Sequence, residues 1–142
     1  MRTRYFALIF GIMYLIVGIA GFIPGLMTHN NMPDMAVNTL SGRLFGLFPV
    51  NLLHTLIHLL IGLWGILVWR SFMASRIYAQ SVAVIFAVLT VLGIIPGLNT
   101  LFGLIPLFGH DVWLHLITTI IAAYFGFSTA RGAVGTTSAV PR

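Results

Sequence analysis

The chain contains four apolar segments that are each long enough to cross a lipid bilayer as a helix. They comprise residues 5–23, 50–69, 77–95 and 112–130. A helix needs about 20 apolar residues to cross the hydrocarbon core. Isolated strands would leave backbone polar groups unpaired in lipid, so helices are the expected form. The sequence therefore predicts an all-α fold, an integral membrane four-helix bundle.

The charge composition indicates the same environment. Only 6% of the 142 residues are charged, 59% are hydrophobic and the mean hydropathy is +1.06. A soluble domain carries roughly a quarter charged residues, so this chain has too few charges to cover a surface that faces water. The net charge of +5 does not indicate nucleic-acid binding, because the arginines are scattered between apolar segments. We expect membrane lipid as a partner and no nucleic acid.

The arginines predict the orientation of the bundle. Each pair of helices reverses the chain, so the N-terminus, the turn at 70–76 and the C-terminus lie on one side. That side holds every arginine except Arg43. Because cytoplasmic segments are enriched in arginine and lysine, we expect both termini in the cytoplasm. The predicted location is a bacterial cytoplasmic membrane or a thylakoid membrane, which the chain crosses several times.

The four helices are predicted to form one domain, residues 1–130. Residues 131–142 are rich in small and polar residues and are expected to be a flexible C-terminal tail. A signal peptide is the weaker alternative for residues 5–23, because the apolar segment is long and no small-residue cleavage site follows it.

Two short motifs occur twice in the same order. Residues 22–26 (Phe-Ile-Pro-Gly-Leu) recur at 94–98 as Ile-Ile-Pro-Gly-Leu, and 44–49 (Leu-Phe-Gly-Leu-Phe-Pro) recur at 101–106 as Leu-Phe-Gly-Leu-Ile-Pro. Each half then holds two helices and enters the membrane in the same direction. We predict a parallel repeat of two helical hairpins, related by a pseudo-two-fold axis along the membrane normal. Both proline-ended motifs should form turns in the interface opposite the arginine-rich side, each leading into the next helix.

Small residues and the two acids have predicted structural positions. Gly11 and Gly126 belong to small-residue faces, which let helix backbones approach closely in lipid. Asp111 directly precedes an apolar segment and is predicted to cap the N-terminus of that helix. Asp34 lies in the polar loop 27–43. Two acids so placed, with no nucleophile motif and no cysteine, lead us to expect that the protein is not an enzyme.

The histidines are the candidate binding residues. Asn51, His54 and His58 are spaced i, i+3 and i+7, which places them on one helix face, and the repeat aligns His54 with His115. Imidazole binds metal ions, haem and chlorophyll-type pigments, so the three histidines are candidate ligands for any of these groups. The alternatives are proton or ion handling and a structural role. The hydrogen-bond partners expected under the structural role are Thr118, Thr119, Tyr124 and backbone carbonyls.

The repeat also predicts the position of the two aligned histidines. His54 and His115 should lie at matching depth and face protein rather than lipid. In a simple up-and-down ring, however, helices 50–69 and 112–130 are diagonal, and the small faces of the other two helices would close the axis. We therefore expect the two histidines on separate flanks of the bundle.

The resulting functional hypothesis is a structural or accessory membrane protein, acting as a subunit of a larger complex or as a homo-oligomer. The alternative is a haem-, chlorin- or metal-binding membrane module that uses the helix histidines. A small transporter is less favoured, because helices 5–23 and 77–95 contain almost no polar residues. An absorption spectrum and a metal analysis of the purified protein discriminate between the first two.

Several of these segments resemble one protein family. The resemblance is carried by Phe-Ala-Leu-Ile-Phe-Gly from Phe6, by the segment 44–58 with its Asn-Leu-Leu-His, by the second Leu-Phe-Gly-Leu motif, and by Asp-Val-Trp-Leu-His from Asp111. The chain is similar over about residues 5–127 to an uncharacterised family of small four-helix membrane proteins from cyanobacteria and actinobacteria, known only as a domain of unknown function. The resemblance implies a four-helix membrane fold and brings no activity, substrate or cofactor.

Overall fold

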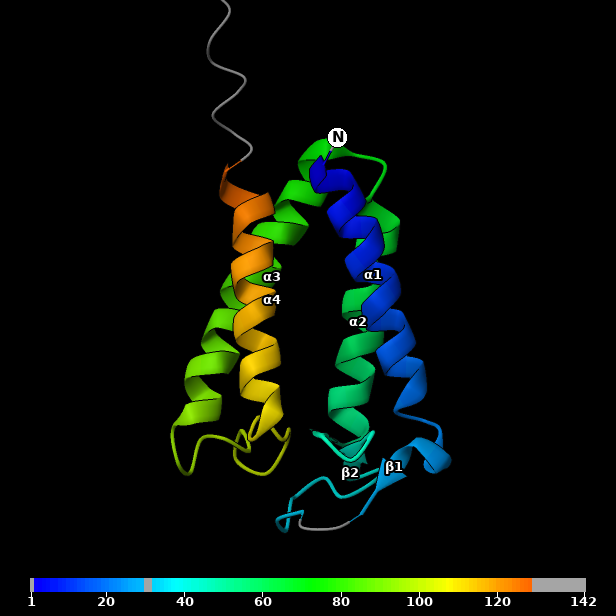
Figure 1. The fold of residues 1–142 in the computed structure, drawn as a ribbon, viewed down its shortest axis with the longest axis vertical. Coiled ribbons are helices and arrows are strands. Elements are labelled where there is room, and N and C mark those ends of the chain that lie inside the picture. The colour runs from blue at the N-terminus through cyan, green and yellow to red at the C-terminus, as the bar shows by residue number, and fades with distance from the viewer. Residues whose placement is uncertain (1, 30–31, 129–142) are drawn as a thin grey trace, which may run out of the picture.

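The computed structural model describes residues 2–29 and 32–128, and it is mostly helical (Figure 1). The four helices are α1 (Arg2–Ala20), α2 (Leu52–Val68), α3 (Phe72–Ile94) and α4 (His110–Phe127). Each overlaps one of the four predicted segments. The predicted C-terminal tail, residues 131–142, lies outside the described residues.

A small sheet that the sequence analysis did not predict lies between α1 and α2. After the short 3-10 helix η1 (Pro24–Leu26) come the strands β1 (Met27–Thr28), β2 (Gly42–Leu44) and β3 (Phe48–Val50). They form an antiparallel sheet in the order β1-β2-β3, with Thr28 opposite Arg43 and Arg43 opposite Pro49. The sheet lies at the end of the molecule opposite the N-terminus (Figure 1).

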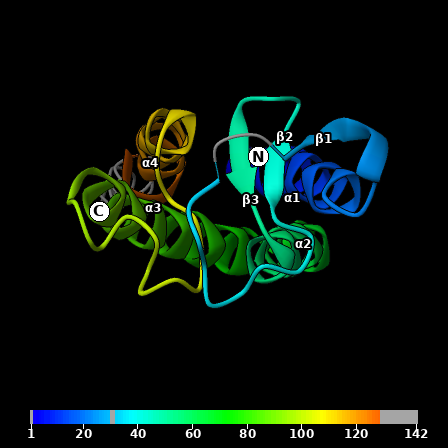
Figure 2. The ribbon, with the colours of Figure 1, turned by 90° about the horizontal axis from the view of Figure 1, so that it is seen from below.

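The helices pack as two pairs, α1 with α2 and α3 with α4 (Figures 1 and 2). Between the pairs, α1 contacts α3 most extensively. A cluster of buried aromatic residues from α1 and α3 fills this contact. Its largest members are Phe6, Phe10, Tyr14, Tyr78 and Phe86.

Glycines bring the helix backbones within each pair into direct contact. A Cβ atom added at Gly11 of α1 would lie 2.7 Å from the Ile66 nitrogen and 2.8 Å from the Gly62 oxygen of α2. A Cβ at Gly126 of α4 would lie 2.9 Å from Cγ and 3.0 Å from the nitrogen of Gln80 in α3. Both spacings are too short for a side chain, so this close approach requires glycine.

Both Leu-Phe-Gly-Leu motifs fold into the same turn. The central residues have positive φ in each: 53° and 73° at Phe45-Gly46, and 59° and 82° at Phe102-Gly103. A hydrogen bond from the last leucine nitrogen to the first leucine oxygen closes both turns, at 3.1 Å in the first and 3.2 Å in the second. Positive φ at both central positions is typical of a type I′ turn. The first turn joins β2 to β3, so it belongs to a hairpin rather than to an isolated amphipathic segment.

Arg2, Arg4, Arg70 and Arg76 lie at the end opposite these turns, as predicted, and Arg43 lies in the sheet beside the first turn. Arg4 donates from Nε to the Trp69 carbonyl at 3.0 Å, and Arg76 donates from Nε to the Gly126 carbonyl at 3.0 Å. Both carbonyls belong to C-terminal helix turns, where a cation is favourable. The start of α1, the α2–α3 turn and the end of α4 therefore meet at one end, away from the sheet (Figure 1).

The outer faces of all four helices are apolar. Ile16 is 60% exposed, Leu60 66%, Val84 58% and Ile117 54%. By length and composition, α1 and α3 could each cross a membrane, and α2 is a shorter apolar helix.

Candidate metal site

The N-cap of α2 positions His54, the first residue of the site. Asn51 is fully buried, and its side-chain oxygen accepts a hydrogen bond from the His54 nitrogen at 3.0 Å. Its amide nitrogen donates to the carbonyls of Val37 at 3.0 Å and Leu104 at 2.7 Å. One side chain therefore starts α2 and joins this start to the turn between α3 and α4. This connection brings the first turn of α2 towards α4.

The helix α4 begins differently from the prediction. Its N-cap is Gly109, with φ at 71°, and Asp111 is the second residue of the helix. The predicted capping role of Asp111 was therefore wrong. The carboxyl group instead points into the molecule, where the residue is only 1% exposed. Glycine can adopt the left-handed conformation that starts this helix, which leaves the acid available for the interior.

Asp111 lies between two histidines. Its Oδ2 atom is 3.6 Å from Nε2 of His54 and 3.6 Å from Nε2 of His115. His54 is 3% exposed and His115 is 1% exposed, so both face protein as predicted. Their ring centroids are 6.1 Å apart. The expectation that α2 and α4 would hold these histidines on separate flanks was therefore wrong.

The third candidate histidine adjoins the same cluster. The ring of His58 lies 4.4 Å from the ring of His54 and 5.4 Å from the ring of Tyr14, measured between centroids. His58 is also buried. The structure thus brings together all three histidines singled out in the sequence and adds Asp111.

The threonine and tyrosine hydrogen bonds of the structural alternative are not made by these imidazoles, whereas a backbone hydrogen bond links His54 to Pro49. Thr118 bonds instead to the Tyr14 hydroxyl at 3.1 Å, and Thr119 donates to the backbone carbonyl of His115 at 2.8 Å. Tyr124 is 54% exposed. Within the described residues, Asp111 Oδ2 and His115 Nδ1 are buried without a hydrogen-bond partner. Buried polar atoms without partners are costly, so the cluster is suited to a bound cation.

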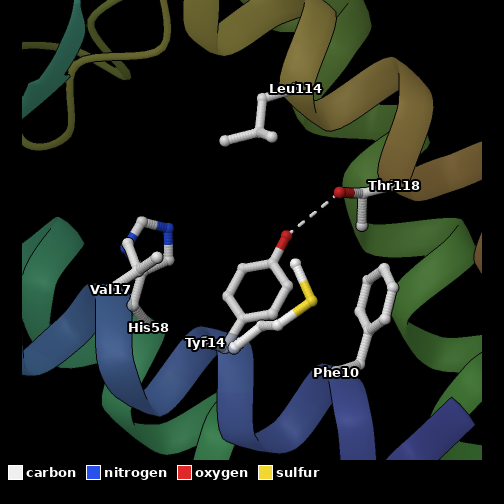
Figure 3. Close-up of a pocket in the computed structure, with 7 residues that line it drawn as sticks. Phe10, Tyr14, Val17, His58, Leu114 and Thr118 are labelled. Carbon is white, nitrogen blue, oxygen red and sulfur yellow. Dashed lines mark hydrogen bonds between the residues drawn. The ribbon is translucent and has the colours of Figure 1, made fainter.

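A cavity of about 70 Å³ lies beside the cluster, between α1 and α4. In Figure 3 the Tyr14 hydroxyl points across it to Thr118, and His58 approaches it from α2. Its lining is almost entirely apolar, apart from these groups. The lining residues are Phe10, Met13, Tyr14, Val17, His58, Leu114 and Thr118.

The molecule is thus a small four-helix protein with two helices apolar enough to cross a membrane and a buried histidine–aspartate cluster. The chain belongs to the family described as Domain of unknown function (DUF4383), whose model matches residues 4–128. This match confirms the resemblance to an uncharacterised family. No curated protein and no solved structure matches the chain.

Proposed function

We propose that the protein is a multi-pass membrane protein that binds a divalent transition-metal ion, with zinc as the first choice, between its two helix pairs. One observation carries the proposal. His54, Asp111 and His115 each offer one ligand atom, these atoms lie within 4.8 Å of one another, and all three residues are buried.

The donor set fits zinc chemistry. Imidazole nitrogen and carboxylate oxygen are ordinary zinc ligands, and two histidines with one carboxylate also suit iron(II). With metal–ligand bonds of about 2.0–2.1 Å, ligand atoms around a tetrahedral ion lie about 3.3 Å apart. The two 3.6 Å distances from Asp111 Oδ2 need only a small contraction to reach this value.

The same geometry favours a bare ion over a haem or chlorin ring. A flat macrocycle bound by two imidazoles must occupy the space between their coordinating nitrogens. Here a carboxylate oxygen lies beside the Nε2 atoms of both His54 and His115. The adjacent cavity, at about 70 Å³, offers little room for a ring of that size.

The membrane location is supported by the outer surface. Large apolar side chains cover the outward faces of the helices, and the two ends differ in charge. Polar residues inside membrane helices are expensive and usually point into the bundle, where they mark functional sites. The buried cluster follows this pattern, because its members point inward while the lipid-facing positions are apolar.

Cysteine labelling tests this location, because the natural chain has no cysteine. We expect Thr39→Cys, at the sheet end, to react with a membrane-impermeant maleimide added to spheroplasts. Ser71→Cys, in the α2–α3 turn, should react only in inside-out vesicles, because the arginine-rich end faces the cytoplasm. Labelling of both positions from the same side would contradict the multi-pass topology.

A zinc titration of the purified protein tests the metal site. We expect one zinc ion per chain, and a loss of affinity of about 100-fold or more in His115→Ala, since even outer-shell changes cost 10- to 100-fold. His110→Ala is the matched control, because His110 is exposed and begins the same helix. Circular dichroism checks that both variants keep their helices. Equal binding by the wild type and His115→Ala would overturn the proposal.

A second candidate function is structural, in line with an accessory subunit of a larger membrane complex or a homo-oligomer. It is favoured by the position of the cluster, which joins the starts of α2 and α4 across the two helix pairs. In that case the cluster would be a polar clasp, meaning a set of polar contacts that holds α2 against α4, rather than a ligand site. The same titration decides, because a clasp binds no zinc.

A further inference from the structure

A second groove lies between α1 and α4, near the arginine-rich end of the molecule. Its volume is about 380 Å³. Its walls are apolar, and Arg2 is the one charged residue that lines it. The walls include Tyr5, Ile9, Phe10, Ile121 and Phe125.

Arg2 differs from the other described arginines at this end. The guanidinium groups of Arg4 and Arg76 donate to carbonyls at helix C-termini. The Arg70 guanidinium lies 5.7 Å from the centroid of the Trp69 ring. Within residues 2–29 and 32–128, the exposed Arg2 side chain makes no hydrogen bond, ion pair or ring contact. A positive charge without a partner among these residues therefore lies at an apolar groove.

We propose that this groove binds an anionic phospholipid of the inner leaflet, with its phosphate on Arg2 and an acyl chain along the walls between α1 and α4. The guanidinium fork matches the geometry of phosphate oxygens and forms charge-assisted hydrogen bonds with them. The apolar walls match a hydrocarbon chain, which a free phosphate ion does not have. The proposal rests on the membrane location proposed above and is independent of metal binding.

Charge complementarity selects this lipid class over the alternatives. A zwitterionic phospholipid carries its own cation beside the phosphate, so it gains less from Arg2. Each basic residue near a membrane surface favours anionic lipid by about 1 kcal/mol, which corresponds to roughly five-fold in binding. A second copy of the chain seated on this groove would have to bring a negative charge to Arg2, and the acidic side chains lie elsewhere, Asp34 between β1 and β2 and Asp111 in the first turn of α4.

Native mass spectrometry of the full chain in detergent tests the proposal with an equimolar mixture of phosphatidylglycerol and phosphatidylcholine. We expect a preference for phosphatidylglycerol of about five-fold in the wild type. Arg2→Gln should abolish the preference, whereas the matched control Arg70→Gln should keep it. Ile121→Trp, which fills the groove, should reduce the adducts of both lipids while the protein stays folded.

Several results would overturn the proposal. Equal loss of preference in Arg2→Gln and Arg70→Gln would mean that a diffuse positive field, and not this groove, attracts the lipid. If excess glycerol phosphate displaced the phospholipid adducts, the ligand of Arg2 would be a soluble phosphate rather than a lipid. A dimer that persists in the wild type and dissociates in Ile121→Trp would make a second copy the occupant. Failure of the zinc titration leaves these results unaffected, and failure of the cysteine-labelling experiment removes the membrane location itself.

Discussion

The substitution Gly11→Ala is expected to destabilise the protein by about 3 kcal/mol, because its new methyl group would meet backbone on the facing helix. The three nearest atoms would be backbone atoms of Ile66, Gly62 and Gly65, at 2.7, 2.8 and 3.0 Å. Backbone atoms cannot rotate away as a side chain can, so α1 and α2 must separate. Alanine is the better helix former by about 1 kcal/mol, which acts in the opposite direction. The measurement is the free energy of unfolding in mixed detergent micelles.

Gly25→Ala is the matched control for this prediction. No atom lies within 4 Å of a Cβ at Gly25, and this glycine does not have positive φ. We expect the control to leave the free energy of unfolding nearly unchanged. Stabilisation by Gly11→Ala would contradict the close backbone contact, since it would show that helix propensity outweighs any clash.

The helices were predictable because their signals are local and repeated. Apolar length locates each one, and the structure places α1 at Arg2–Ala20 against the predicted 5–23. The difference has two physical causes. Arg4 can join the helix because its guanidinium finds the Trp69 carbonyl, and the Pro24 turn forms a separate 3-10 helix. The sheet was not predictable, because strands of two or three residues show no alternation and β1 pairs with β2 across a long loop.

The histidines of the site were predictable, but their arrangement was not. Helix spacing places His54 and His58 on one face, and the repeat links His54 to His115. The meeting of α2 and α4 depends on long-range contacts, above all the hydrogen bond from Asn51 to the Leu104 carbonyl. No local pattern encodes that bond, and the assumption of a simple ring of helices predicted that the two histidines lie apart.

The role of Asp111 was missed although a signal for it exists. An acid directly before an apolar segment has the appearance of a helix cap, so Asp111 was interpreted only as a cap. Asp111 and His115 are spaced i, i+4, however, which places them on one helix face. An acid within an apolar helix usually has a partner. The combination of these two observations indicates a buried acid–histidine pair rather than a cap.

Substitutions of Asp111 are expected to distinguish most clearly between an effect on zinc binding and an effect on the stability of the metal-free protein. With zinc at 100 times its dissociation constant, the wild type should gain about 2.7 kcal/mol in its free energy of unfolding. Asp111→Asn should lose nearly all of this gain, because the amide keeps the shape but not the charge of the ligand. Asp34→Asn is the control, since Asp34 lies in the exposed loop, and it should respond to zinc like the wild type.

Asp111→Leu separates a metal site from a polar clasp. In EDTA we expect this variant to be as stable as the wild type or more so, because leucine removes the cost of burying a carboxyl oxygen that has no hydrogen-bond partner. The Asp111 Oδ2 atom supports this direction, since it lacks a hydrogen-bond partner among the described residues. If the carboxylate instead clasps α2 to α4, Asp111→Leu should lose about 3 kcal/mol or more in EDTA. Unfolding curves with and without zinc therefore distinguish a loss of ligand binding from a loss of the contact between the helix pairs.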